Sequence, residues 1–234
     1  MSDKPVCVVI GVGPGNGAAF ARRFAGEGYR VALLARRRAL SDELASELPG
    51  ARAYSCDVSD PASIESAFAA IEADLGAPSV VVYNAGSGVF GTFEDVSPAD
   101  FEAAWRVNAL GLFAVARRVA PAMRAAGAGS LIVVGATASR RGVPRTAAFA
   151  PAKAAQRSLA ESLARTLWPA GIHVALIVVD GVVDLPATRA WMKDKPDSFF
   201  IQPTDVADTA LYLARQPRSA WSFEVEARPF AEKW

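Results

Sequence analysis

The stretch IGVGPGNGAAF, residues 10–20, places four glycines between an apolar run and an alanine-rich amphipathic segment. Glycines at such a junction permit a tight turn and let backbone amides approach a phosphate closely. They read as G-x-x-x-G-x-G at positions 11, 15 and 17, or as G-x-G-x-x-A at 13, 15 and 18. Because a helix N-terminus favours an anion, the stretch predicts a dinucleotide-binding turn. The residues expected to hold the dinucleotide here are Gly11, Gly13, Gly15, Asn16 and Gly17.

Beyond this stretch, short runs of Val, Ile and Leu alternate with longer alanine-rich segments. The apolar runs predict strands at residues 5–10, 30–35, 51–55, 79–83, 130–134, 173–179 and 221–226. The amphipathic segments predict helices at residues 15–27, 39–48, 61–75, 98–126, 148–168 and 204–216. Several strands are continuously apolar, as strands buried on both faces should be. This alternation predicts an α/β fold with a parallel sheet between two helical layers, in one domain over residues 1–234.

Composition excludes several classes of function. A chain of 234 residues with 52% hydrophobic residues can bury a large core, and its net charge of +1 gives no field for recruiting nucleic acid or an acidic membrane. No apolar run reaches membrane-spanning length, and the N-terminus has no signal-peptide pattern. Cys7 and Cys56 lie in apolar runs and are expected to be buried, reduced thiols. We expect a soluble cytoplasmic protein without a metal site.

The end of the second predicted strand indicates which dinucleotide binds. NAD-binding units usually place an acid there, which accepts from the ribose 2′-hydroxyl. The segment VALLARRRAL, residues 31–40, instead has Arg36, Arg37 and Arg38, with no acid before Asp42. A guanidinium can donate two parallel hydrogen bonds to a phosphate, whereas a carboxylate repels it. The segment therefore predicts NADP(H) rather than NAD(H), although these arginines could also be a solvated helix entry.

Further motifs follow in order: SCDVSD at 55–60, YNAG at 83–86, WRVNALG at 105–111, Lys153, and IVVDGVVD at 177–184. Together with the glycine turn, they resemble the short-chain dehydrogenase/reductase superfamily over nearly the full length of the chain. The resemblance implies a Rossmann-type, seven-stranded parallel sheet of order 3-2-1-4-5-6-7 and an oxidoreductase acting on a carbonyl or alcohol. It implies cofactor contacts from Asp57, Val58, Asn84, Ala85, Gly86, Lys153, Gly181 and Val183, and catalytic positions at Asn108 and Lys153.

Two catalytic positions depart from the family pattern. The family places a tyrosine four residues before the lysine, and this chain has Phe149 there, within AAFAPAKAA. It places a serine thirteen residues before the tyrosine, and counting back from Phe149 gives Ala136. The usual Pro-Gly after the sixth strand is replaced by Asp180-Gly181. The stretches GATAS, FAPAK and RPFAEKW resemble a divergent subgroup of the family.

Neither alanine nor phenylalanine can donate a proton to a nascent alkoxide, so carbonyl reduction by the usual route should be feeble. Thr137 is a weak substitute, because strand alternation should turn it away from the site. Asp180 and Asp184 could act if burial raised the pKa of either carboxyl, but a capping role is favoured. Tyr83, Thr146 and His173 have structural interpretations, whereas Trp191 could cover a substrate pocket or only pack a mobile loop.

Three functions remain open on this evidence. The first is an NADP(H)-dependent oxidoreductase with a substitute acid, acting on an unidentified carbonyl or alcohol. The second is a catalytically silent NADP(H)-binding protein that serves as a sensor or oligomer partner. The third, disfavoured by the full cofactor apparatus, is a non-redox enzyme such as a lyase. In the family, helices corresponding to residues 98–126 and 148–168 form subunit interfaces, so a homodimer or homotetramer is expected.

Overall fold

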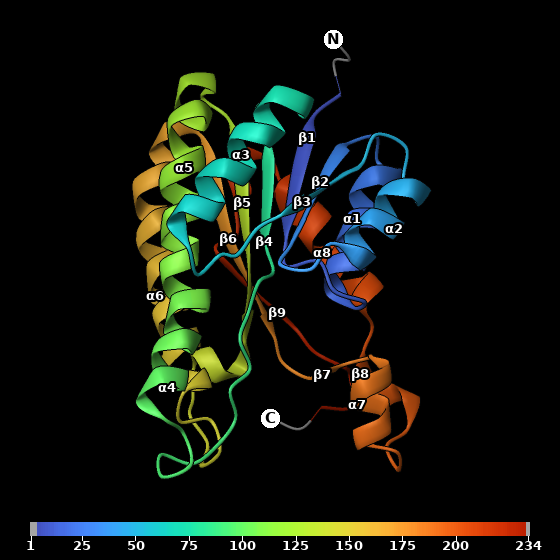
Figure 1. Cartoon of the computed structure of the whole chain (residues 1–234), viewed down its shortest axis with the longest axis vertical. Coiled ribbons are helices and arrows are strands. Elements are labelled where there is room, and N and C mark those ends of the chain that lie inside the picture. Colours follow the sequence, from blue (N-terminus) through green and yellow to red (C-terminus); the bar gives the residue numbers. More distant parts are fainter. Residues whose placement is uncertain (1–3, 233–234) are drawn as a thin grey trace.

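A seven-stranded parallel sheet forms the centre of the molecule (Figure 1). The structure, a computed structural model, describes residues 4–232. The strands lie in the order β3-β2-β1-β4-β5-β6-β9. Their bounds are β1 Val6–Ile10, β2 Arg30–Ala35, β3 Arg52–Ser55, β4 Val80–Tyr83, β5 Gly129–Ala136, β6 Ile172–Val179 and β9 Glu224–Ala227. This order confirms the predicted 3-2-1-4-5-6-7 arrangement, because β9 is the seventh strand of the sheet along the chain.

Helices cover both faces of the sheet, which makes three layers. Figure 1 shows α3, α5 and α6 on one side of the sheet and α1, α2 and α8 on the other. Successive side chains of a strand point to opposite faces, so β1 sends Val8 into a core with Phe68 and Val9 into a core with Phe20. The helices are α1 Asn16–Gly26, α2 Ala39–Glu47, α3 Pro61–Leu75, α5 Gly111–Ala126, α6 Phe149–Leu167 and α8 Pro203–Ala214.

Two segments extend past the carboxyl ends of the strands, at the lower edge of the sheet in Figure 1. One is α4 (Pro98–Trp105); the other comprises β7 (Val182–Val183), α7 (Pro186–Trp191) and β8 (Phe200–Ile201). β7 and β8 pair as a separate two-stranded sheet. No pattern in the sequence predicts an element between residues 184 and 203, because α7 and β8 are too short to have a readable periodicity.

Two predicted elements needed correction. The helix expected over residues 98–126 is divided into α4 and α5 by a π-helical turn, Arg106–Leu110, a rare form often found at functional sites. The seventh strand begins at Glu224 rather than at residue 221. Trp221 instead stacks on the His173 ring at 4.7 Å, and its indole N–H donates to the carbonyl of Gln216. The other predicted elements are confirmed with boundary shifts of at most two residues.

The thiols of Cys7 and Cys56 are buried and free of disulfides, in agreement with the sequence analysis. No helix within residues 4–232 combines the length and the apolar character that crossing a bilayer requires. Residues 1–3 of the predicted domain, and the last two residues of the RPFAEKW stretch, lie outside the described residues.

Candidate cofactor cleft and active site

The backbone itself requires two glycines of the turn between β1 and α1. Gly11 has a left-handed φ of 89°, and a Cβ atom there would lie 2.6 Å from the amide nitrogen of Ala85. A Cβ atom on Gly17 would lie 2.7 Å from the Gly11 carbonyl oxygen. Gly13, by contrast, has open space around its Cβ position, and Gly15 gives α1 no side-chain cap. The amides of Ala18 and Ala19 donate to the Gly13 and Gly15 carbonyls, so the helix amides left for an anion are those of Asn16 and Gly17.

Two other segments of the chain contact this turn. The amide of Asn84, after β4, donates to the Gly11 carbonyl at 2.8 Å. From the other side, Leu185 covers the turn, since a Cβ atom on Gly15 would lie 2.3 Å from its Cδ2. Asn16 and Asn84 line the same cavity. The structure thus brings the predicted residues of the glycine turn and of the YNAG segment together.

The predicted adenosine end lies at the carboxyl ends of β2 and β3. Arg36 and Arg37 are exposed and form no ion pair with any residue of the described chain, whereas Arg38 pairs with Asp42 at 2.6 Å. Asp57 accepts from the hydroxyl and backbone N–H of Ser59, and these bonds, with a smaller contribution from the Arg36 charge, lower the pKa of Asp57. Val58, next to Asp57, is buried. Arg36 and Asp57 therefore face one region, where Arg36 is available to a phosphate.

Lys153, on α6, is the main buried cation of the cleft. Its Nζ donates to the Val134 carbonyl at 3.1 Å and to Gln156 Oε1 at 2.9 Å. Burial lowers the pKa of Lys153 to about 8. A Cβ atom on Gly86 would lie 3.5 Å from Lys153 Nζ and 3.5 Å from Asn108 Oδ1, so the three predicted residues lie together.

Asn108 lies inside the π-helical turn, and the turn explains its orientation. The Asn108 amide nitrogen donates to the Ala104 carbonyl at 2.8 Å, which fixes the side chain. Its Oδ1 is buried and has no hydrogen-bond partner within the described chain. A buried acceptor without a partner is costly, so this atom is suited to a ligand or a water. Together with the open Gly13 and the free Arg36, it fits a bound dinucleotide.

A cavity of 760 Å³ opens beside Lys153, at the two positions where the resemblance predicts altered catalytic residues. Ala136 ends β5 and Phe149 begins α6, and both line this cavity. The Phe149 ring packs against Phe90 with centroids 5.0 Å apart, which makes one wall aromatic. Neither altered position presents a hydroxyl. Gly181 and Val183 also line the cavity, from the segment after β6.

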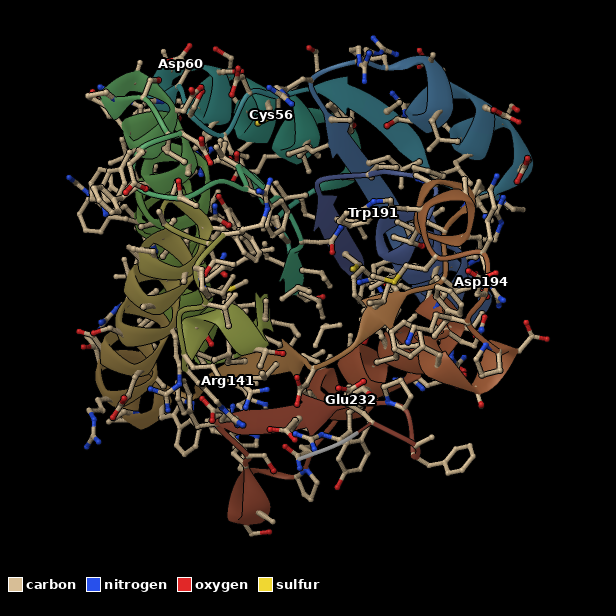
Figure 2. All side chains as sticks on the ribbon, turned by 90° about the horizontal axis from the view of Figure 1, so that it is seen from below. Cys56, Asp60, Arg141, Trp191, Asp194 and Glu232 are labelled. Atoms are coloured by element: carbon tan, nitrogen blue, oxygen red, sulfur yellow. The ribbon has the colours of Figure 1, made fainter. Side chains whose placement is uncertain are left out.

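Figure 2 looks onto this edge of the sheet. Arg141 and Glu232, which both line the cavity, lie along one side of this view, and Trp191 of α7 lies across from them. Trp191 is 82% exposed and does not line the cavity, so it does not cover the site in this structure.

Thr137 and Asp180 correct two sequence-based interpretations. β5 ends at Ala136 and Thr137 begins a 3-10 turn, so strand alternation does not apply and Thr137 lines the cavity. Its hydroxyl donates to the Asp180 carboxylate. Asp180 also accepts from Arg228 rather than capping the following segment. The structure therefore joins two candidates that the sequence analysis treated separately.

The other candidate proton donors have structural roles. Asp184 binds Arg189 and Gln202, which lower its pKa to about 2, and it does not line the cavity. The Thr146 hydroxyl closes its own turn onto Val143. Tyr83 is buried and donates to the Val107 carbonyl, while His173 lies between the Leu213 and Ser222 carbonyls.

Sequence reasoning missed three residues that shape the site. Gln156 is fully buried and bonds Lys153, and a glutamine one helical turn after that lysine was the available signal. Arg228 approaches Asp180 from a position 48 residues further along the chain, so no local spacing reveals it. Leu185 covers the glycine turn from a segment to which no element had been assigned.

Comparisons with known proteins agree with this geometry. The family model described as enoyl-(acyl carrier protein) reductase matches residues 11–222. The chain is 32% identical over 222 residues to 3-oxoacyl-[acyl-carrier-protein] reductase MabA of Mycobacterium tuberculosis, covering 91% of this chain and 86% of that protein. It is 27% identical over 224 residues to D-threitol dehydrogenase of Mycolicibacterium smegmatis, covering 91% and 86%.

Solved structures show the same relationship. A short-chain dehydrogenase from Rhodopseudomonas palustris superposes with a TM-score of 0.83 at 32% identity, covering 98% of this chain and all of that one. A metagenomic short-chain oxidoreductase in complex with NADP gives 0.82 at 31% identity, covering 97% and 98%. The chain therefore belongs to the short-chain dehydrogenase/reductase superfamily and has an oxidoreductase fold.

Proposed function

We propose that the protein is an NADP(H)-dependent oxidoreductase of an alcohol or carbonyl substrate, with weak catalysis by the usual route. One observation carries the proposal: a single cavity runs from Asn16, at the start of α1, to Lys153 and the altered positions Ala136 and Phe149. A dinucleotide bound at the glycine turn has space to extend to Lys153. When bound, such a cofactor supplies or accepts a hydride.

NADP(H) is favoured over NAD(H) by the charges at the end of β2. Arg36 and Arg37 are exposed there without carboxylate partners in the described chain, and no acid follows Ala35 directly. A guanidinium–phosphate contact is a charge-assisted bond worth roughly ten- to a hundredfold in affinity. The metagenomic relative described above was solved with NADP, which is consistent with this preference.

Titration of NADPH and of NADH by calorimetry tests the cofactor assignment. We expect NADPH to bind at least tenfold more tightly, and Arg36→Ala to remove most of that difference. Arg38→Ala is the matched control, because Arg38 pairs with Asp42 and should leave the preference unchanged. Equal affinities for the two cofactors in the unaltered protein would overturn the assignment.

Some residues of the cleft can hold the cofactor, whereas others lack the proton that the usual mechanism donates to the substrate. Lys153 carries a proton that can hydrogen-bond ribose hydroxyls, and Asn108 offers a free acceptor. Ala136 and Phe149 cannot orient or protonate a carbonyl oxygen, which favours a second candidate: a silent NADP(H)-binding protein. The two candidates are distinguished by turnover, because both predict cofactor binding.

We also propose a homodimer or homotetramer. Phe101 and Trp105 lie one turn apart on α4, and both are exposed, as is Phe113 on α5. Exposed aromatic side chains along one helical layer are typical of a protein interface. Light scattering should give a dimeric or tetrameric mass at micromolar concentration, and Trp105→Lys should shift it toward the monomer. A monomer in the unaltered protein would contradict this proposal.

A further inference from the structure

Thr137 and Asp180, which both line the cavity, have an unusual hydrogen-bond polarity. Thr137 has one hydroxyl proton, and that proton is donated to Asp180 Oδ1. The Val179 carbonyl lies 3.5 Å from the same hydroxyl and is the weaker acceptor. Thr137 therefore presents oxygen lone pairs, rather than a proton, to the cavity that it lines.

Hydrogen bonds from two side chains hold Asp180 in this arrangement. Its residue is 6% exposed, and Arg228 donates to Oδ2 while Thr137 donates to Oδ1. Arg228 also contacts Glu226 at 2.6 Å, so the guanidinium is itself fixed. A carboxylate paired with a guanidinium accepts hydrogen bonds and cannot donate one. Thr137 and Asp180 thus present a pair of acceptors beside Ala136, which contributes no donor.

A carbonyl oxygen would meet lone pairs at this position, whereas a hydroxyl could donate to them. Phe90, Phe149 and Val143 give the same cavity an apolar part, while Lys153, Arg141 and Glu232 line it elsewhere. A bound ligand that excludes water from these lone pairs without donating to them leaves them unpaired, which is costly, so a ligand without a donor is disfavoured there. The site therefore differs from one that binds a carbonyl oxygen by donating hydrogen bonds to it.

From this geometry we infer that Thr137 and Asp180 are specificity-determining residues that select an apolar or aromatic alcohol over the corresponding carbonyl compound. The inference deepens the proposed function, on which it rests for the position of the cofactor. Thr137 contacts the ligand hydroxyl, Asp180 fixes the direction of the Thr137 proton, and Arg228 positions Asp180.

Ligand-observed NMR titration with 1-phenylethanol and acetophenone tests the inference, because the two probes differ only in the hydroxyl and carbonyl groups. The titration is made with NADP⁺ present and repeated without it. We expect the alcohol to bind on the order of tenfold more tightly than the ketone. Equal binding, tighter binding of the ketone, or no saturable binding of either probe would overturn the inference.

Two variants make the test specific. Asp180→Asn can donate its amide proton to Thr137 Oγ1, which frees the hydroxyl to donate into the cavity, so the preference should shift toward acetophenone. Thr137→Val should abolish discrimination. Asp184→Asn is the matched control, because Asp184 bonds Arg189 outside the cavity, and it should keep the wild-type preference. Thermal melts check that each variant is folded.

An unchanged preference in Asp180→Asn would overturn the inference while leaving the cofactor assignment intact. Failure of NADP⁺ to bind would overturn the proposed function instead. The alcohol–ketone preference measured without cofactor would then decide the inference by itself.

Discussion

The two ends of the cleft, the glycine turn and the region of Ala136 and Phe149, differ in how strictly the backbone limits their side chains. At the glycine turn, Gly11 and Gly17 cannot carry a side chain without a backbone clash, so the fold itself requires these residues. At the altered end, Ala136 and Phe149 occupy the ends of β5 and α6 without any disturbance of those elements. The backbone thus keeps its shape at the two positions where we propose that the usual proton donors are absent. A conserved fold therefore indicates cofactor binding more strongly than it indicates turnover.

Restoring the missing donors should produce the largest effect. Phe149→Tyr places a phenol one turn from Lys153, whose ammonium lowers the pKa of such a group from about 10. Ala136→Ser adds a second donor, and because the two act as a unit, the double variant should exceed either single one. We expect NADPH-dependent reduction of a carbonyl panel to rise about 10²-fold.

Phe149→Leu with Ala136→Ser serves as the control for simple repacking and should give no comparable gain. Absence of any gain in the Tyr/Ser double variant, with NADPH binding intact, would show that the cavity itself has diverged. The silent-binder function would then be favoured.

Lys153 lies between the glycine turn and the altered positions, and its titration should give the next largest effect, on the free energy of unfolding. Since burial lowers its pKa from the ordinary 10.5 to about 8, the unfolded chain binds the proton more tightly. The free energy of unfolding therefore rises as the pH increases from about 8 to about 10.4. Relative to Lys153→Met, the free energy of unfolding of the wild type should rise by on the order of 2 kcal/mol over that pH range.

Chemical denaturation at several pH values measures this difference, and Lys193→Met, at an exposed lysine, is the control. A difference between wild type and Lys153→Met that is independent of pH would show that Lys153 is not desolvated. It would also remove the physical basis for assigning this residue to a buried site.

A matched pair of glycine variants should give the smallest effect. Gly17→Ala places a methyl group 2.7 Å from the Gly11 carbonyl and should lower Tm by several degrees. Gly13→Ala has open space and should leave Tm within about 1 °C, yet weaken NADPH binding severalfold by filling the approach to the turn. Unchanged affinity in Gly13→Ala, measured by calorimetry, would show that the dinucleotide does not approach there.

Features of the fold and the site could be predicted from the sequence where a short motif along the chain specifies them. The glycine turn follows from its own spacing, while the strand order and the placement of Ala136, Phe149 and Lys153 around one cavity follow from the family resemblance that such motifs carry. The contact of Arg228 with Asp180 depends on the parallel pairing of β6 with β9, which aligns Val179 with Ala227. No spacing along the chain encodes that register.

The interpretation of Thr137 failed for a different reason. Strand alternation is a sound argument inside a strand, but β5 ends one residue before Thr137 and the chain then turns. Element boundaries are the least certain part of sequence reasoning, and here the side chain in question lies at one. The π-helical turn that orients Asn108 was likewise invisible, because its residues fit an ordinary helical pattern.

The central claim, that the cofactor end is intact while the usual proton donors are lost, is tested most directly on the unaltered protein. NADPH binding is first titrated to saturation, and the initial rate of NADPH oxidation is then measured in the same preparation with a panel of ketones, aldehydes and quinones. We expect saturable NADPH binding and a rate of NADPH oxidation about 10²-fold below that of the Ala136→Ser, Phe149→Tyr variant. Turnover by the unaltered protein that equals that of the variant would contradict it.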